Sequence, residues 1–428
     1  MVYKIADNIV SPLGTTTAQN YQAVKQGNTA LSYHANKWDI PKPFTASVFS
    51  EAQNHEMAVA GLTRFESMVV CSARQALAGT TVDIAAKNVV FILSTTKANV
   101  ELLGSADAQS DVLHPGESAA RIAKKLGITT SPIVVCNACI SGLSSIILAQ
   151  RLLENRTYDY AIVCGADALG KFIISGFQSL NAMTEHECRP YDIERIGMNL
   201  GEAVATIILS ATPADGNTPW AIGCGAVRND AYHISSPSKK GDGAYRCLLP
   251  SVEAASVESL ALVNAHGTAT MFMDQMESVA IERAGLAGIL VNSLKGYYGH
   301  TLGAAGVLET VLTMRALDDH TIIGTRGFEE LGVSGKIQVS ATNSETDKWY
   351  KAKLQFITID EKTDKEKRST VTYLVQAGSF NGAVKNIEEV MGGTMIDYVI
   401  STVSETTLMD VFEYATKAKK DNKPEYEQ

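Results

Sequence analysis

The stretch SPIVVCNACISGLSSIILAQRLL, residues 131–153, decides the fold of this chain. Its first part, 133–135, is the β-branched apolar run of a buried strand. Its last part, 143–153, carries apolar residues at helical spacing. The small residues at 137–142 predict a tight turn between them. A strand that passes directly into a helix indicates a fold of mixed α/β layers.

The turn carries a thiol, Cys139, at the start of the predicted helix. The free N–H groups and the positive dipole end of a helix start favour the thiolate form of a cysteine. Because the thiolate is the nucleophile, this position suits covalent catalysis. A cysteine in an apolar run is also a good small core residue, and the stretch alone leaves that alternative open.

The alternation of strands and helices extends over most of the chain, and the second half repeats the order of the first. We predict strands over 8–10, 88–93, 160–164, 203–209, 221–227, 260–264 and 289–292, and helices over 16–26, 56–78, 116–126, 248–258, 275–285 and 303–317. Residues 28–55 and most of 170–203 are predicted to be irregular.

Composition restricts the function classes. The 428 residues are 45% hydrophobic and 19% charged, as in an ordinary globular enzyme. The net charge of -9 argues against nucleic acid as a partner. No apolar run is long enough to span a membrane, and the N-terminus lacks a secretory signal. Seven scattered cysteines predict reduced thiols in a cytoplasmic protein, and Cys136 and Cys139 lack the second CxxC pair that a zinc site needs.

Two histidines stand in loops that follow predicted strands. His266 lies in NAHGTAT, residues 264–270, and His300 lies in NSLKGYYGHTLGAAG, residues 292–306. Strand-end loops are favoured places for catalytic groups. One such histidine has an ordinary structural explanation. Two of them, together with a cysteine at a helix start, are hard to explain by packing.

The motifs ACISG (138–142), HGT (266–268) and KGYYGH (295–300) resemble the three signatures of the β-ketoacyl-[acyl-carrier-protein] synthases of the elongating Cys-His-His type. The resemblance runs from SPLG at 11–14 to about Lys348 and includes RPYD at 189–192. The fold that it implies is α/β, a thiolase-like duplicated α-β-α-β-α layered sandwich. The assembly that it implies is a homodimer, or a heterodimer with a related synthase.

The resemblance implies a role for each motif. Cys139 takes the acyl group from acyl carrier protein and holds it as a thioester, and its backbone N–H forms half of the oxyanion hole. Neutral His266 and His300 donate hydrogen bonds to the thioester carbonyl of malonyl-acyl carrier protein and stabilise the enolate formed when carbon dioxide leaves. Lys295 pairs with a carboxylate, matched here by Glu309, although an ordinary buried ion pair explains these two residues equally well.

The implied product is a β-ketoacyl-acyl carrier protein in fatty acid, polyene or polyketide synthesis. This chemistry needs no metal and no cofactor beyond the phosphopantetheine of the carrier. Thr268, Asp274 and Glu277 are expected to support the site. Met198, which replaces a phenylalanine of many members, is a candidate for the acyl pocket, and Ala269 stands where the family usually has glycine.

The resemblance stops before the end of the chain. The family closes with two core strands and a Gly-Phe-Gly-Gly loop that supplies the second oxyanion N–H, and we find no such loop; GSFNG at 378–382 is a superficial echo. Without the last strands, neighbouring backbone groups and apolar faces are expected to be uncovered.

The sequence changes character at Trp349, and the remainder predicts a small α+β unit. Its β-β-α-β pattern has strands over 350–359, 370–376 and 395–403, a helix capped by Ser379, and a further strand candidate over 408–414. The pattern bears a weak resemblance to phage-like proteins of unknown function. We therefore expect two synthase halves, 1–215 and a truncated 216–348, a small unit at 349–414 and a disordered tail at 415–428.

Two alternatives stay open at this point. The chain is a catalytically impaired relative that acts as a carrier-binding partner subunit, which the missing loop favours. The second alternative is a cysteine hydrolase, because Cys139 is followed by a later histidine. Against it, the sequence around Cys139 lacks a hydrolase signature, and a hydrolase does not need the second histidine loop.

Overall fold

The computed structural model describes residues 1–105, 111–213, 220–233, 236–341, 348–360, 365–377, 380–391 and 398–406. The chain divides into two compact units, Met1–Thr342 and Asn343–Gln428. The predicted boundary at 348/349 lies a few residues beyond this division. The further boundary at 215/216, between the two synthase halves, stays a prediction.

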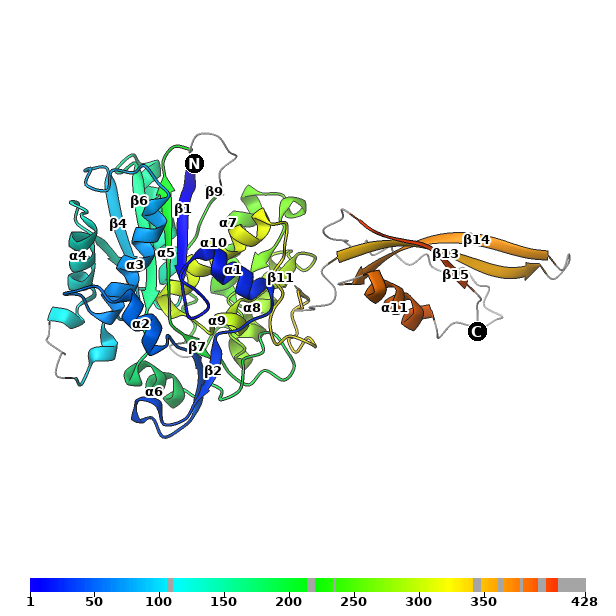
Figure 1. Cartoon of the computed structure of the whole chain (residues 1–428), viewed down its shortest axis with the longest axis horizontal. Helices are drawn as coiled ribbons and strands as arrows, with labels where there is room; N and C mark the ends of the chain where they lie inside the picture. Colours follow the sequence, from blue (N-terminus) through cyan, green and yellow to red (C-terminus); the bar gives the residue numbers. More distant parts are fainter. Residues whose placement is uncertain are drawn as a thin grey trace. The chain divides into compact units, whose positions relative to one another are not determined.

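The first unit is built on a six-stranded sheet in the order β5-β4-β6-β8-β1-β9 (Figure 1). Its strands are β1 (Val2–Val10), β4 (Val89–Ser94), β5 (Ile133–Val135), β6 (Tyr160–Asp167), β8 (Ala203–Ser210) and β9 (Ala221–Ile222). The strand β4 runs parallel to β5 and β6, while β8 runs antiparallel to both β6 and β1. The carboxyl ends of β4, β5 and β6 therefore meet at one edge of the sheet.

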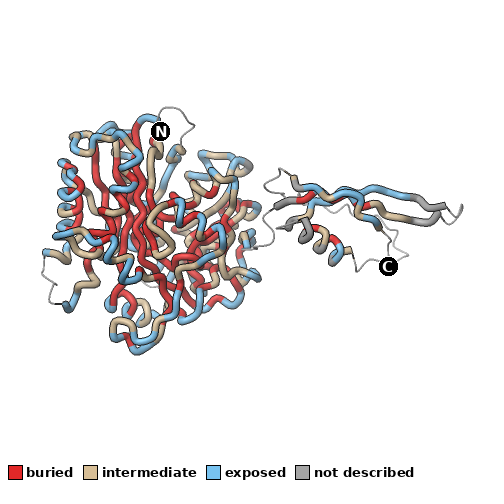
Figure 2. Tube along the Cα trace, in the orientation of Figure 1, coloured by how far each residue is buried: buried red, intermediate tan, exposed pale blue. Residues whose placement is uncertain are grey.

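Helices cover both faces of this sheet, which explains why its strands are continuous apolar runs. They are α1 (Thr17–Lys25), α3 (Arg64–Ala78), α4 (Pro115–Leu126), α5 (Ser141–Glu154) and α10 (Ala305–Asp318). On β4, Phe91 packs with residues of α3 and α4, whereas the next residue, Ile92, packs with residues of α1, α5 and α10. Figure 2 shows the central strands as the most buried part of the unit.

The two central helices α5 and α10 cross at a pair of glycines. A Cβ on Gly142 would lie 2.9 Å from the Cα of Gly306 and 2.8 Å from the backbone nitrogen of Val307. A Cβ on Gly306 would lie 2.5 Å from the backbone nitrogen of Leu143. Only glycine allows this approach. The crossing therefore brings the starts of the two helices, and the loops that precede them, to one place.

A second, three-stranded parallel sheet has the order β10-β11-β12, with β10 (Val263–Asn264), β11 (Leu290–Asn292) and β12 (Gln338–Val339). The helices α7 (Asp242–Ala254) and α8 (Met271–Arg283) contribute Tyr245 and Ile281 to the cluster around Val291 of β11. Within the described part of the chain, β10 is an edge strand with β11 as its one neighbour. Its residues are half-buried, whereas β4, β6 and β8 are almost wholly buried.

Two secondary-structure predictions are wrong: residues 28–55 are not irregular, and residues 223–227 are not part of a strand. Residues 28–55 contain β2 (Leu31–His34), η1 (Lys37–Asp39), β3 (Phe44–Ser47) and the start of α2 (Glu51–Met57). Residues 170–203 are mostly irregular, as predicted, and contain α6 (Lys171–Ser179) and β7 (Leu200–Gly201). The strand β3 is the centre of a three-stranded sheet, where it pairs antiparallel with the nearby β2 and parallel with β7, which is far away in sequence. Conversely, the predicted strand 221–227 ends at Ile222, and residues 223–227 are mostly exposed without strand structure.

Five further short helices of the described residues lie in the loops between these elements. These are η2 (Val100–Leu102), η3 (Asp111–Leu113), η4 (Val257–Ser259), α9 (Lys295–Tyr298) and η5 (Leu302–Ala304). No helix of the described residues is long and apolar enough to cross a membrane.

The second unit is a small α+β fold, as predicted. Its sheet has the order β14-β13-β15, all antiparallel, with β13 (Lys348–Asp360), β14 (Lys365–Ala377) and β15 (Tyr398–Glu405). Ala352 and Leu354 pack against Ile387 of α11 (Phe380–Met391). The last three residues of the GSFNG stretch, 380–382, lie within α11 and belong to this unit. Ser379 and the predicted segments 408–414 and 415–428 lie outside the described residues.

Candidate active site

Three predicted residues from three different loops lie together. Cys139 follows β5, His266 follows β10 and His300 follows β11. The sulfur and one ring nitrogen of each histidine all lie within 4.8 Å of one another. The two imidazole rings meet edge to face, with centroids 5.0 Å apart and an interplanar angle of 88°. The structure thus brings together the cysteine and both histidines that the sequence singled out.

Cys139 sits in a tight turn that leads into α5. Ala138 adopts a left-handed conformation, with φ of 47°. The hydroxyl of Ser141 accepts the N–H of Asn137 and donates to the carbonyl of Ala138. Burial raises the pKa of the Cys139 thiol, while Lys295, the backbone N–H of Cys139 and Lys97 oppose that rise. The thiol therefore depends on nearby positive charge to form the nucleophilic thiolate.

The protonation state of His300 follows from one hydrogen bond. Its Nδ1 accepts the backbone N–H of Leu302 at 3.2 Å, so the neutral ring carries its proton on Nε2. The residue is 1% exposed, and Nε2 has no hydrogen-bond partner among the described residues. Burial, with contributions from His266 and Lys295, holds the pKa of His300 well below its usual value. His300 is therefore a neutral donor with a free N–H.

His266 is held by the first turns of α8. The carboxylate of Glu277 accepts the backbone N–H groups of His266 and Gly267 at 2.7 and 2.8 Å. Asp274 accepts the N–H groups of Thr268 and Ala269 in the same loop. Burial and, to a lesser extent, Lys295 lower the pKa of His266 to about 3. This histidine too is neutral at physiological pH.

Two of the predicted supporting residues, Asp274 and Glu277, thus hold the His266 loop by accepting its backbone N–H groups. Asp274 is fully buried, and burial raises its pKa to about 7 despite the N–H groups that it accepts. Thr268 is buried, and its hydroxyl pairs with that of Thr270 at 3.1 Å. Ala269, in place of the expected glycine, has φ of 63°, a left-handed conformation that strains a residue with a Cβ.

Lys295 and Glu309 form a buried ion pair beside the triad. The side chain of Lys295 is 1% exposed and that of Glu309 14%, and the ammonium group contacts the carboxylate directly. Burial raises the pKa of Glu309, and Lys295 counteracts part of that rise. The pair places a fixed positive charge near Cys139 and both histidines.

Met198, the acyl-pocket candidate, is 9% exposed and packs in an apolar cluster with Ile173 and Leu302. Leu302 lies in the loop that carries His300. Met198 therefore belongs to the same apolar cluster as the loop that carries His300. The acyl-pocket role stays a prediction.

Sequence reasoning missed two anchors of the site. Asp167, at the end of β6, is fully buried and accepts the Thr95 hydroxyl, the Thr96 N–H and the Gly303 N–H at 2.8, 3.0 and 2.7 Å. Asn199 accepts the N–H of His300 through its backbone carbonyl at 2.7 Å. The position of Asp167 at the end of a buried strand was a usable signal, because a carboxylate there must find partners.

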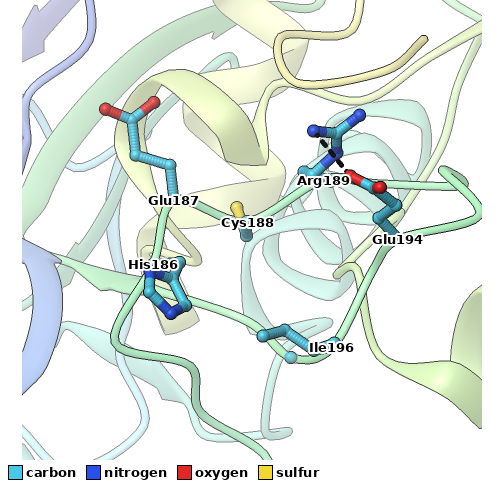
Figure 3. Close-up of a pocket in the computed structure, with 7 residues that line it drawn as sticks. His186, Glu187, Cys188, Arg189, Glu194 and Ile196 are labelled. Carbon is cyan, nitrogen blue, oxygen red and sulfur yellow. Dashed lines mark ion pairs between the residues drawn. The ribbon is translucent and has the colours of Figure 1, made fainter.

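The hollow shown in Figure 3 lies at a different place in the loop 186–197. It has a volume of about 240 Å³ and is lined by His186, Glu187, Cys188, Arg189, Glu194, Ile196 and Gly197. Arg189 and Glu194 form an ion pair across it at 3.2 Å. Burial raises the pKa of the Cys188 thiol to about 12, so this cysteine is not a nucleophile. None of the predicted site residues lines the hollow.

Comparison with known families agrees with the geometry. Residues 5–214 match the model for the N-terminal domain of β-ketoacyl synthases, and residues 221–329 match the model for the C-terminal domain. The chain belongs to the β-ketoacyl synthase family. In this chain, residues 332–414 also match a domain of unknown function, DUF4494, whose start lies about ten residues before the structural division of the chain.

Curated relatives are synthases as well. The 3-oxoacyl-[acyl-carrier-protein] synthase 2 of Rhizobium meliloti is 33% identical over 223 residues, which are 48% of this chain and 52% of the relative. The synthase spans about half the length of this and the next two curated relatives. The 3-oxoacyl-[acyl-carrier-protein] synthase 2 of Synechocystis sp. is 26% identical over 365 residues, 75% of this chain and 86% of the relative.

Solved structures show that the synthase has the thiolase-like fold predicted from its motifs. A β-ketoacyl synthase from Burkholderia phymatum superposes with a TM-score of 0.70 at 24% identity, over 79% of this chain and 92% of that one. The ketosynthase ApeO from Xenorhabdus doucetiae, solved with its chain length factor ApeC, superposes with a TM-score of 0.68 at 23% identity, over 80% and 91%.

The triad has residue types that zinc accepts, but the tautomer of His300 disfavours a metal. The nitrogen of His300 that has no partner is Nε2, which carries the proton. Metal binding there requires the proton to move to Nδ1, and the hydrogen bond from Leu302 is then lost. His300 is therefore arranged to donate a hydrogen bond rather than to bind a metal.

Proposed function

We propose that the chain catalyses the decarboxylative condensation of an acyl group on Cys139 with malonyl-acyl carrier protein. The observation that carries this proposal is the convergence of one cysteine and two neutral histidines within 4.8 Å. A nucleophile and a pair of N–H donors are what acyl transfer and enolate stabilisation require.

The first step is acyl transfer to sulfur. The Cys139 thiolate attacks the acyl thioester, the carbon–sulfur bond to the phosphopantetheine breaks, and the leaving thiolate takes the proton that Cys139 lost. The start of α5 and the positive charge of Lys295 favour the attacking thiolate. No metal takes part in this step as proposed.

The second step forms the carbon nucleophile. The malonyl carbon–carboxylate bond breaks, carbon dioxide leaves, and the electron pair enters an enolate whose oxygen accepts hydrogen bonds from His266 and His300. The free Nε2–H of buried His300 suits this role because it has no other partner among the described residues. The enolate carbon then attacks the acyl-Cys139 carbonyl, the thiolate is released, and a β-ketoacyl thioester forms.

The proposed partners follow from the substrates. Both acyl groups would arrive on acyl carrier protein, and the synthase would supply no cofactor of its own. A homodimer, or a heterodimer with a related synthase, is proposed because structural neighbours include ketosynthases solved with a chain length factor and with an acyl-carrier protein. A cytoplasmic location is proposed because the seven cysteines are free thiols.

The sequence lacks the Gly-Phe-Gly-Gly loop with which the family closes its C-terminal half. In the same half, β10 is an edge strand of its sheet within the described residues. Loss of one oxyanion N–H lowers a rate by about 10²–10³. The proposal therefore predicts slow acyl transfer and slow condensation, because both steps pass through a tetrahedral oxyanion at the carbonyl carbon bound to Cys139, while decarboxylation keeps the two histidines that it needs. The alternative of a non-catalytic partner subunit predicts neither step.

The test is intact mass after incubation with an acyl-carrier thioester, with Cys139→Ala as the control. An acyl adduct that is absent in the control supports acyl transfer. Carbon dioxide release from malonyl carrier, lost in a His266→Ala and His300→Ala double variant, supports the second step. A folded protein that shows neither adduct nor carbon dioxide release overturns the proposal in favour of the partner subunit.

A further inference from the structure

A lysine outside the three motifs of this sequence lies on the loop next to the Cys139 turn. Lys97 belongs to the loop after β4, and Cys139 belongs to the turn after the parallel neighbour β5. Ser94 lies opposite Val135 in the register, and the N–H of Thr95 donates to the Val135 carbonyl at 3.2 Å. The two loops therefore leave the sheet at the same edge, next to each other.

The Lys97 loop is held in one shape. Thr95 and Thr96 bind the buried carboxylate of Asp167, which also binds the loop of His300 through Gly303. Ala98 is fully buried with φ of 45°, and its N–H donates to the Thr95 hydroxyl at 2.9 Å. A left-handed alanine costs about 1–2 kcal/mol, and such strain persists where the surrounding structure demands it. The backbone on both sides of Lys97 is thus fixed.

The charge of Lys97 is not neutralised by contact. Its ammonium group donates to the Thr96 hydroxyl at 3.2 Å, and it has no ion pair within the described residues. Lys295, in contrast, contacts the carboxylate of Glu309. The two lysines near the nucleophile therefore differ: Lys295 opposes the rise in the pKa of the Cys139 thiol more strongly, but it is paired with Glu309, whereas Lys97 has no ion pair within the described residues.

Apart from Lys295, the other titratable groups that the structure describes around Cys139 supply no positive charge. His266 and His300 are neutral, and Asp167 acts in the opposite direction by raising the pKa of the thiol. Partial burial also raises the pKa of the thiol of Cys136, three residues before Cys139, and Lys97 opposes that rise as well. The loop after β4 thus acts on the whole turn that carries the nucleophile.

We infer that Lys97 is a positioning residue that stabilises the thiolate of Cys139 from the neighbouring strand-end loop. This inference deepens the proposed function, since it concerns activation of the same nucleophile. It does not depend on condensation, because the thiolate can be measured alone. It also explains why a lysine occupies a half-buried place without a carboxylate partner.

The test is the rate of alkylation of each cysteine by iodoacetamide between pH 6 and 10, with the modified peptides quantified by mass spectrometry. In Lys97→Met the midpoint for Cys139 should rise by about 0.5–1 pH unit, which makes alkylation about three- to ten-fold slower below the midpoint. Lys97→Arg keeps the charge and should restore the original midpoint. Cys224, an exposed thiol in contact with α7, is the internal reference and should not change.

Lys97→Gln is a second neutral variant, and near-ultraviolet circular dichroism confirms that each variant is folded. In the unchanged protein, 0.5 M salt should slow alkylation of Cys139 relative to Cys224, because the charge of half-exposed Lys97 is screened. A Cys139 midpoint that stays within 0.2 pH units in both neutral variants overturns the inference. An unchanged midpoint together with normal condensation overturns only the role of Lys97, while a shifted midpoint without condensation overturns only the proposed function.

Discussion

The buried ion pair between Lys295 and Glu309 gives the sharpest stability prediction. Replacing Glu309 by Gln leaves the Lys295 ammonium, 1% exposed, without its counter-charge. Removing one partner of a buried pair costs about 3–5 kcal/mol, and the lower value applies here because Gln still accepts a hydrogen bond. At about 2 cal/mol/K per residue, the unit Met1–Thr342 has an unfolding entropy of about 0.7 kcal/mol/K. We therefore expect Tm to fall by about 4 °C.

The matched control is the double variant Lys295→Met with Glu309→Gln, which removes both charges and keeps the length of the side chains. A neutral replacement for a buried pair is often nearly neutral in free energy, so the double variant should recover most of the lost stability. Differential scanning calorimetry of the full chain measures all three proteins. A double variant that loses as much as the sum of the single changes, or a single variant within 1 °C of the parent, would refute a buried, desolvated pair.

Three further outcomes follow from the same structure. Gly267→Ala should disrupt the His266 loop and abolish carbon dioxide release, because its Cβ would lie 2.6 Å from the Cβ of Ser293 at a φ of 38°; a variant with parental release speaks against the loop geometry. Burial raises the pKa of Glu101 to about 7 from 4.5, so the free energy of unfolding should fall by about 3 kcal/mol as pH rises from 4.5 to 7. In urea titrations, Glu101→Gln should flatten this dependence of the unfolding free energy on pH, and an equal dependence in variant and parent contradicts the assignment. Titration of His266 or His300 should not change the rate of carbon dioxide release between pH 5 and 8, since burial holds the pKa values of both histidines below this range. A rate profile with a histidine titration midpoint near pH 6.5 would contradict neutral donors.

The sign of the Glu101 effect follows from its two states. The side chain is 9% exposed and neither carboxylate oxygen has a hydrogen-bond partner within the described residues. Between the unfolded and the folded pKa the unfolded carboxyl is ionised and the folded one is protonated. The penalty is therefore absent at pH values below 4.5 and complete above pH 7, so stability falls as pH rises through this window.

The first sheet was predictable because its information is local. Strands such as β4 and β6 are buried on both faces, and burial alone produces the apolar runs VVFIL and YAIVC. The strands β2 and β3 are only four residues long, so their pairing with each other leaves little pattern in the sequence, and the pairing of β3 with β7 joins residues more than 150 positions apart. In contrast, the apolar pattern at 221–227 is that of a strand, yet beyond Ile222 the described structure gives it no neighbouring strand with which to pair.

The site shows the same distinction. Cys139, His266 and His300 were found because each stands in a small-residue loop after a strand, and the structure brings them together. Asp167 and Lys97 carry no motif, and their importance depends on which strands lie side by side. A sequence shows that a carboxylate ends a buried strand, but it does not show which two loops that carboxylate joins.

The glycine crossing of α5 and α10 has a consequence for how the reaction is divided. The first half of the synthase unit supplies the group that would accept the acyl chain, and the second half supplies both groups that would stabilise the enolate. Carbon–carbon bond formation would join these two sets of groups, and the Gly142–Gly306 crossing sets the distance between them. A Cβ on Gly142 would lie 2.8 Å from the backbone nitrogen of Val307, so even the smallest added side chain would push the two halves apart. The crossing is therefore the point at which the spacing between the nucleophile and the enolate-stabilising groups is fixed.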